Sequence, residues 1–334
     1  IYPRVAGNRP TIVDNPNFDA VESAHALFKA VDGIGTNENV IIDIITSCSN
    51  KQRQEIKKQF QKIYRKDLVK EFKSEILIRF SFDFKQLLES MFMTPLELDT
   101  HLLKHTTKGL GTDEKALVEI LLTRSAEEMI QIKDEYVKRF RISLEDDVAD
   151  DTSGDFRKFV FPLCRAKRKG VALVNLSKAR DVAAEINDTF TQYRGTDTPR
   201  FDFIGFCCCE NFKQIKATVE EYEKLTDEVM TDFIDNEFHG DAAYALKSAI
   251  KCSNSMPGFF AERLYKSMEG IATNDEALIR ILVCRCEIDL EDIKREFESR
   301  YRKTLESKIK SHTSRQFKQL LLAILRGNVT KEAM

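Results

Sequence analysis

Apolar residues recur with the period of an α-helix through most of this chain, beginning near Phe18. Leu27 and Val31 fall on one face of a first predicted helix, and Ile41 and Ile45 on one face of a second. Three further helices are predicted over residues 56–64, 68–75 and 84–92. The stretch up to residue 92 therefore predicts five short helices in succession, preceded by a proline-containing, irregular head over residues 1–17.

The same plan recurs three more times. Leu117-Val118-Glu119-Ile120-Leu121 matches Val40-Ile41-Ile42-Asp43-Ile44, the fourth copy carries Leu278-Ile279-Arg280-Ile281-Leu282, and the third copy diverges most. No alternation typical of β-strands accompanies turn signals, so the predicted fold is all-α, with four homologous repeats of about five helices each. We predict repeats over residues 18–92, 93–169, 188–252 and 253–328, and a linker helix over 170–187 between two pairs of repeats.

Composition limits the function classes. The 52 basic and 54 acidic residues of the 334 give a formal net charge of −2, so no general basic field is available for nucleic acid. The eight cysteines lie mostly in apolar helical patterns, which favours reduced thiols in a cytosolic protein. No apolar run approaches the roughly 20 residues that span a bilayer, and no signal pattern opens the chain, so any membrane role is expected to be peripheral.

A glycine-containing turn stands at one place in each repeat. Lys108-Gly109-Leu110-Gly111-Thr112 is the fullest copy, Gly33-Ile34-Gly35-Thr36 keeps both glycines, Gly195-Thr196 keeps half, and Gly270-Ile271-Ala272-Thr273 is weakened. Positions 35, 111, 195 and 272 are 76, 84 and 77 residues apart. In the first two copies a carboxylate follows the second glycine at the same offset of 40, as Glu75 (35 + 40) and Asp151 (111 + 40).

Two interpretations of these turns are open. The turns could simply join helices, with Thr36, Thr112 and Thr196 as N-caps. Alternatively, glycines let backbone carbonyls point outward together, and carbonyls with a distant carboxylate suit the six to eight oxygen ligands of calcium. The turns hold neither histidine nor cysteine, and the chain has no EF-hand pattern and no strand-preceded phosphate loop. Two copies sharing both the glycines and the acid favour the calcium site.

These residues resemble the annexin family from about Phe18 onward. The Lys-Gly-Leu-Gly-Thr-Asp turn, Leu-Glu-Asp-Asp-Val at 144–148 and Asp-Thr-Ser-Gly at 151–154 carry the resemblance. It implies a curved disc whose convex face meets the membrane, with each turn between the first two helices of a repeat and each acid between the fourth and fifth. The implied calcium ligands are carbonyls of Val31, Gly33 and Gly35 with Glu75 in repeat one; Thr107, Gly109 and Gly111 with Asp151 in repeat two; and Gly195 with Glu237, rather than Asp235, in repeat three.

The fourth repeat departs from that pattern. It offers Met268 and Gly270, but Ala272 replaces the second glycine and His312 stands at the acid position. We therefore predict that this repeat binds calcium weakly or not at all.

The resulting hypothesis is calcium-dependent binding to anionic phospholipid membranes through these turns and distant acids, with Ca²⁺ as the cofactor and no enzyme activity. The scattered histidines and the lack of a nucleophile motif argue against catalysis, including a calcium-assisted lipid hydrolase. The rival hypothesis is a helical-repeat scaffold for protein partners with vestigial turns. We expect a cytoplasmic monomer that is peripheral at membranes when calcium is present. A protein partner at the head, self-association on membranes and a place on the cell surface are left open.

Overall fold

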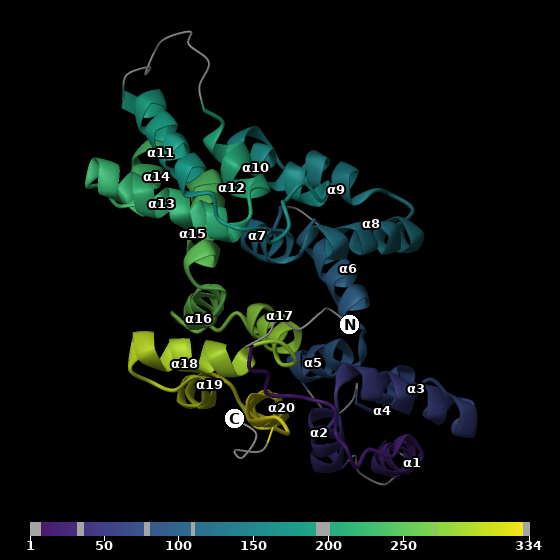
Figure 1. The fold of residues 1–334 in the computed structure, drawn as a ribbon. Coiled ribbons are helices and arrows are strands. Elements are labelled where there is room, and N and C mark those ends of the chain that lie inside the picture. The colour runs from purple at the N-terminus through teal and green to yellow at the C-terminus, as the bar shows by residue number, and fades with distance from the viewer. Residues whose placement is uncertain are drawn as a thin grey trace. The chain divides into compact units, whose positions relative to one another are not determined.

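The computed structural model describes residues 8–31, 37–76, 81–107, 111–191, 201–270 and 272–329, except for the side chains of residues 74–76. Within these ranges it contains twenty α-helices and no β-strand (Figure 1). The all-α prediction is confirmed. None of these helices is long and apolar enough to cross a membrane.

The helices fall into two compact units, which we describe separately. The first unit comprises residues 1–98 and 260–334, and the second comprises residues 99–259. The chain passes from one unit to the other inside α6 and α16, so the first unit combines repeats one and four, while the second combines repeats two and three. The predicted linker between two pairs of repeats suggests pairs in chain order, whereas the compact units combine the outer two repeats and the inner two repeats.

The first unit contains two sets of five helices. Its first set is α1 (Ala20–Val31), α2 (Glu38–Thr46), α3 (Asn50–Tyr64), α4 (Leu68–Ile76) and α5 (Phe82–Phe92). Its second set is α16 (Met256–Ser267, shared with the other unit), α17 (Asp275–Arg285), α18 (Leu290–Tyr301), α19 (Leu305–His312) and α20 (Arg315–Arg326).

The second unit also contains two sets of five helices. Its first set is α6 (Pro95–Thr106, shared with the first unit), α7 (Glu114–Thr123), α8 (Ala126–Phe140), α9 (Leu144–Asp151) and α10 (Gly154–Cys164). Its second set is α11 (Leu176–Thr191), α12 (Phe203–Cys209), α13 (Phe212–Thr226), α14 (Met230–Glu237) and α15 (Gly240–Asn254).

The helix α11 covers most of the residues predicted as a linker helix over 170–187. It packs along α13, as α1 packs along α3 in the first repeat. Its apolar face, which includes Val182 and Ile186, is buried. We therefore propose that repeat three begins at Leu176, leaving only a short connection before it. The helical period identified the helix correctly, but a period does not say which neighbour its apolar face will cover.

Both units join their two repeats in the same way. In the first unit α2 packs on α20, α17 packs on α5, and α5 packs on α20. In the second unit α12 packs on α10, α7 packs on α15, and α10 packs on α15. These contacts bury apolar side chains such as Leu320 and Ile324 of α20 completely. Burying each such side chain is worth about 1.5–3 kcal/mol, so the second and fifth helices form the joint core of each pair.

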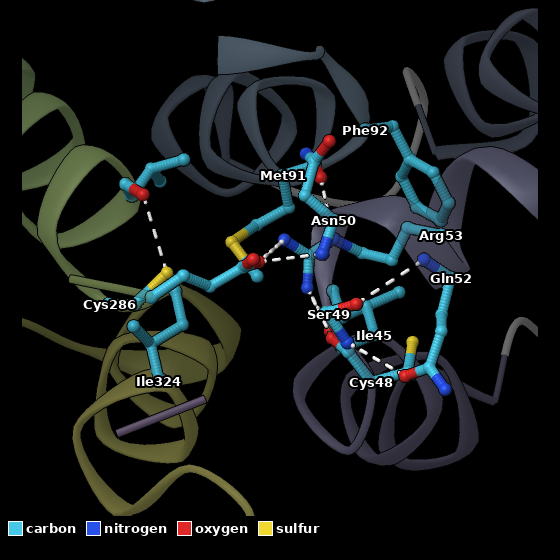
Figure 2. Close-up of polar contacts among 12 residues, drawn as sticks. Ile45, Cys48, Ser49, Asn50, Gln52, Arg53, Met91, Phe92, Cys286 and Ile324 are labelled. Carbon is cyan, nitrogen blue, oxygen red and sulfur yellow. Dashed lines mark hydrogen bonds and ion pairs between the residues drawn. The ribbon is translucent and has the colours of Figure 1, made fainter. Parts of the chain in front are cut away.

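A buried arginine also joins the repeats of the first unit. Arg53 on α3 is 1% exposed, and its guanidinium donates to the carbonyls of Ile45, Cys48 and Met91 and to the Glu287 carboxylate (Figure 2). Ile45 and Met91 lie in the last turns of α2 and α5, where helix carbonyls lack intrahelical partners. One side chain thus satisfies two helix ends of repeat one and reaches repeat four.

The described part of the head lies against the first unit. Arg9 forms an ion pair of 2.5 Å with Asp292, and the backbone N–H groups of Thr11 and Ile12 both donate to the Cys286 carbonyl. The side-chain amide of Asn328 accepts from the backbone N–H of Val13 and donates to its carbonyl, at 2.8 Å each. The head is irregular, as predicted, but it is held along repeat four by hydrogen bonds.

Candidate functional site

The backbone closes each described turn with the same hydrogen bond. The N–H groups of Asn37, Asp113 and Asn274 donate to the carbonyls seven residues earlier, those of Ala30, Thr106 and Ser267, at 2.9, 3.1 and 2.7 Å. The turn between the first and second helices therefore has one construction in repeats one, two and four. The glycines between these bonded residues lie mostly outside the described ranges, namely Gly33, Gly35, Gly109 and, in repeat three, Gly195.

The residue that closes the turn is also the N-cap of the second helix. The side chains of Asn37, Asp113 and Asn274 accept from backbone N–H groups three residues later, at 3.3, 2.9 and 2.8 Å. In repeat three the cap is Asp202, which accepts from Gly205 at 2.8 Å. The prediction of threonine caps was wrong by one residue in repeats one and two and by six residues in repeat three. In repeats one and two the amide or carboxylate that follows the threonine takes the cap.

The threonine hydroxyl instead binds the loop that carries the distant residue. Thr112 Oγ1 donates to the carbonyl of Asp151 at 3.2 Å, and Thr273 Oγ1 donates to the carbonyl of His312, also at 3.2 Å. Both bonds span 39 residues. The turn and the acid position are thus held side by side in repeats two and four.

The acid positions share one place in the fold. Asp151, Glu237 and His312 are the last residues of α9, α14 and α19. Glu75 is the second-last residue of α4, and its side chain is outside the described set. The predicted position between the fourth and fifth helices is therefore refined to the end of the fourth helix. Asp235, the rejected alternative, is paired with Lys247 instead.

A left-handed residue follows three positions after each described acid position. Gly154 and Gly240 have φ values of +55° and +59°, and open space surrounds the place where a Cβ would be. In repeat four Arg315 adopts the same conformation at φ +51°. The bend that leads into the fifth helix is therefore shared by three repeats, although repeat four makes it without glycine.

The turn of repeat four differs in its backbone. Gly111 has a φ of +116°, a conformation that residues with a Cβ rarely adopt. Ala272 stands at the matching place and is not among the residues with positive φ. Its carbonyl therefore cannot be oriented by the same backbone geometry as that of Gly111.

The other predicted ligand positions in the described ranges are buried at helix ends. Val31 is the last residue of α1 and is 3% exposed. Thr107 follows α6 and is 9% exposed, and its hydroxyl lies 3.4 Å from the carbonyls of Leu103 and Lys104. Asp151 is exposed, and no described residue donates a hydrogen bond to its carboxylate.

An ion pair joins the two helices that lead to the site of repeat two. Lys104 on α6 lies 2.6 Å from the Asp147 carboxylate on α9, which also accepts from the Tyr136 hydroxyl. Burial and this hydrogen bond raise the pKa of Tyr136 above its usual range. The pair connects the helix before the turn with the helix that ends at Asp151.

Asp151 and Glu237 open onto one cleft of about 430 Å³ in the second unit. Its other lining residues are mostly polar or acidic, and they are Glu114, Thr152, Ser153, Asp155, Phe156, Phe238, His239, Asp241 and Ala242. The acid positions of repeats two and three are thus neighbours within this unit. Sequence spacing gave no sign of this, because the two residues belong to different repeats.

Known families and proteins resemble this chain over most of its length. The annexin family model matches residues 22–89, 99–163 and 259–324, which covers repeats one, two and four and more than half of the chain. Human annexin A11 is 37% identical over 328 residues, covering 98% of this chain, and mouse annexin A13 is 38% identical over 308 residues, covering 92%. The chain spans 64% of annexin A11 and 95% of annexin A13.

Solved structures show the same fold. A structure of annexin III matches with a TM-score of 0.90 and 37% identity, covering 96% of this chain and 98% of that one. A calcium-bound annexin (Sm)1 matches with a TM-score of 0.82 and 29% identity, covering 97% and 94%. The four five-helix sets, the family model and the identity to several annexins agree, and the chain belongs to the annexin family.

Proposed function

We propose that this chain binds anionic phospholipid membranes in a calcium-dependent manner, with its fullest site in repeat two. The carbonyls of Thr107, Gly109 and Gly111 and the carboxylate of Asp151 would hold the ion. The observation that carries this proposal is an exposed carboxylate held beside the Gly111 turn, because the hydrogen bond from Thr112 to the Asp151 carbonyl keeps the two together, whereas the same bond in repeat four holds His312 there. A structural turn between two helices would not need a carboxylate held beside it from another loop.

The residues fit a hard cation. Calcium takes six to eight oxygen ligands, accepts bidentate carboxylates and tolerates irregular geometry. Asp151 is exposed and receives no hydrogen bond from a described residue, so its oxygens are accessible to an ion. When bound, calcium would supply the positive charge that links protein oxygens to lipid phosphate oxygens. The chain itself needs no net basic charge for this, which agrees with its formal charge of −2.

We rank the four sites by the ligands each repeat offers. Repeat one would use Val31, Gly33, Gly35 and Glu75. Repeat three would use Gly195 and Glu237, and the ion pair of Asp235 with Lys247 supports the choice of Glu237. Repeat four lacks both features of a good site: Ala272 does not adopt a positive φ, and His312 offers nitrogen in place of carboxylate oxygen.

We also propose a reducing, cytoplasmic location, peripheral at membranes when calcium is present. None of the eight cysteines is in a disulfide, and six of them are buried. That usage is typical of proteins kept in reduced form. A protein partner at the head and self-association on membranes remain predictions.

Sedimentation with liposomes containing phosphatidylserine tests the proposal. Calcium is stepped from chelator to the millimolar range for the wild type, for the double variant Glu75→Gln with Asp151→Asn, and for His312→Asn as a matched control. We expect calcium-dependent sedimentation that the double variant weakens strongly and the control leaves unchanged. Sedimentation without calcium, or none at all, would contradict the proposal and favour a protein scaffold.

A further inference from the structure

The last turn of α12 gathers thiols around one buried cation. Cys207 and Cys208 are fully buried, Cys209 is half-buried, and Cys252 on α15 is 4% exposed. All four thiols interact electrostatically with Arg168, whose side chain lies in the short connection before repeat three. Four of the eight cysteines of the chain therefore lie near enough to one guanidinium to interact with it.

Arg168 is only partly satisfied at this place. Its Nη1 donates to the Glu210 carbonyl at 2.8 Å, its Nη2 donates to the Cys207 carbonyl at 3.3 Å, and its plane lies 4.4 Å from the Phe212 ring centre. Its Nε has no hydrogen-bond partner, and the residue is only 8% exposed, so bulk water does not replace that partner. A buried, incompletely paired cation stabilises an anion nearby, and the ionisable groups around it are thiols.

Two of these thiols are in direct contact. The Sγ atoms of Cys208 and Cys209 lie 3.5 Å apart, and the single thiol hydrogen of Cys208 has two acceptors at that distance, the Cys209 sulfur and the Gly205 carbonyl. A Cys209 thiolate is the stronger acceptor of the two, because it carries the charge. Cys208 is buried, whereas Cys209 reaches solvent, so Cys209 is the thiol that a reagent can approach. When Cys208 donates to it, Cys209 has its pKa held below the ordinary value by that hydrogen bond first and then by Arg168 and Lys169, while burial and Asp202 oppose them. Burial instead raises the pKa of Cys207, Cys164 and Cys286.

We propose that Cys209 is a site of thiol–disulfide exchange with a small disulfide of the glutathione type, and that Cys208 acts as the hydrogen-bond donor that positions and stabilises its thiolate. The Cys209 sulfur attacks one sulfur of the reagent, whose S–S bond breaks as the new S–S bond forms. The other half leaves as a thiolate with the electron pair and takes a proton from solvent. Cys209 is oxidised and the reagent is reduced, so no further oxidant is needed.

The site lies at the connection between repeats two and three. The Cys209 carbonyl accepts from the backbone N–H of Lys169 at 2.7 Å, and Glu210 pairs with Lys169 and Lys178 at 2.9 and 2.6 Å. A mixed disulfide on Cys209 would add bulk beside these contacts. Modification is therefore expected to loosen the connection as well as to block the thiol.

Mass mapping of the native protein after timed exposure to glutathione disulfide tests this. Cys284 is also half-buried and serves as an internal comparison. Lowering the pKa of Cys209 from 9.0 to about 7 raises its thiolate concentration below that pH about a hundredfold, and the lower nucleophilicity of the weaker base offsets about tenfold of this. We therefore expect Cys209 to react about tenfold faster than a thiol of ordinary pKa, and faster than Cys284. Equal rates at the two cysteines, or faster reaction at Cys284, would overturn the proposal.

Three variants separate the roles of these thiols. Cys209→Ser should abolish the fast modification, while Cys284→Ser should leave it unchanged. Cys208→Ala keeps the Cys209 thiol but removes its hydrogen-bond donor, so the pH at which Cys209 reaches half its maximal rate should rise. An unchanged pH profile in Cys208→Ala would refute the role given to Cys208. Circular dichroism of each variant establishes that it is folded before rates are compared.

Discussion

Replacing Arg53 with methionine removes the cation that joins repeats one and four while keeping most of the aliphatic volume. In the wild type the guanidinium donates to the carbonyls of Ile45, Cys48 and Met91 at 3.0, 2.6 and 2.8 Å, and to Glu287 at 2.8 Å (Figure 2). Glu287 also accepts from the backbone N–H of Asn50 at 2.6 Å. The variant therefore leaves three carbonyls without this donor and one carboxylate without its main partner.

The expected loss follows from burial. A carbonyl left unsatisfied in the interior costs about 1–3 kcal/mol, and breaking a buried ion pair by removing one partner costs about 3–5 kcal/mol. Arg53 is 2% exposed at its side chain, but Glu287 is 25% exposed and can turn toward water. We therefore expect the free energy of unfolding to fall by about 3 kcal/mol, of which the three carbonyls at about 1 kcal/mol each supply most and the partly exposed ion pair little.

Urea unfolding followed by far-ultraviolet circular dichroism measures this loss. Lys57→Met is a matched control, because Lys57 also lies on α3 and its ammonium contacts one carbonyl at the end of α5, that of Phe92, at 3.1 Å. It should cost less than about 1 kcal/mol, as a single half-exposed contact does.

Glu287→Gln, alone and combined with Arg53→Met, isolates the contribution of the ion pair. Most of the loss should persist in the Glu287→Gln background, because the three carbonyls are the larger part of the Arg53 contacts. An Arg53→Met variant no less stable than Lys57→Met would refute the reasoning.

Three further predictions concern single positions. Thr218 is fully buried with a hydroxyl that has no partner, at the place where Ile56, Ile132 and Ile293 stand in the other repeats, so Thr218→Val should stabilise the protein by about 1 kcal/mol in urea unfolding; a loss of stability would contradict it. Arg315 is exposed and has a left-handed backbone conformation, which glycine adopts without strain. Arg315→Gly should therefore raise the free energy of unfolding by about 0.5–1 kcal/mol, and Gly154→Ala should lower it by about 1 kcal/mol, both measured by thermal unfolding. Burial, followed by the neighbouring Asp83, raises the pKa of Asp275 to about 6. The ionised carboxylate therefore costs stability above about pH 6, and this cost disappears as pH falls toward about pH 4, so Asp275→Asn should gain about 1 kcal/mol, a solvent-screened value, at neutral pH and nothing at acid pH. A gain that does not change with pH would contradict the assignment to Asp275.

The sequence by itself determined the helices, their grouping in fives and the family. Helical period and glycines that permit positive φ are encoded within a few neighbouring residues, so they can be identified without tertiary contacts. Gly111 is such a case, since its φ of +116° matches what a glycine at that position predicts. The offset of 39 between Thr112 and Asp151 is also visible in the sequence, although its hydrogen bond is not.

Only the tertiary structure decided which helices meet. The pairing of repeat one with repeat four depends on α17 packing on α5 and α20 packing on α2, and amphipathic faces of similar composition do not specify their partners locally. For the same reason the helical period alone does not assign α11 to a repeat. The burial of Arg53 against Glu287, 234 residues later, and the gathering of thiols around Arg168 likewise arise from contacts between distant segments. Residues close together in the chain decide where helices form, whereas the packing of apolar faces from distant segments decides which helices contact one another.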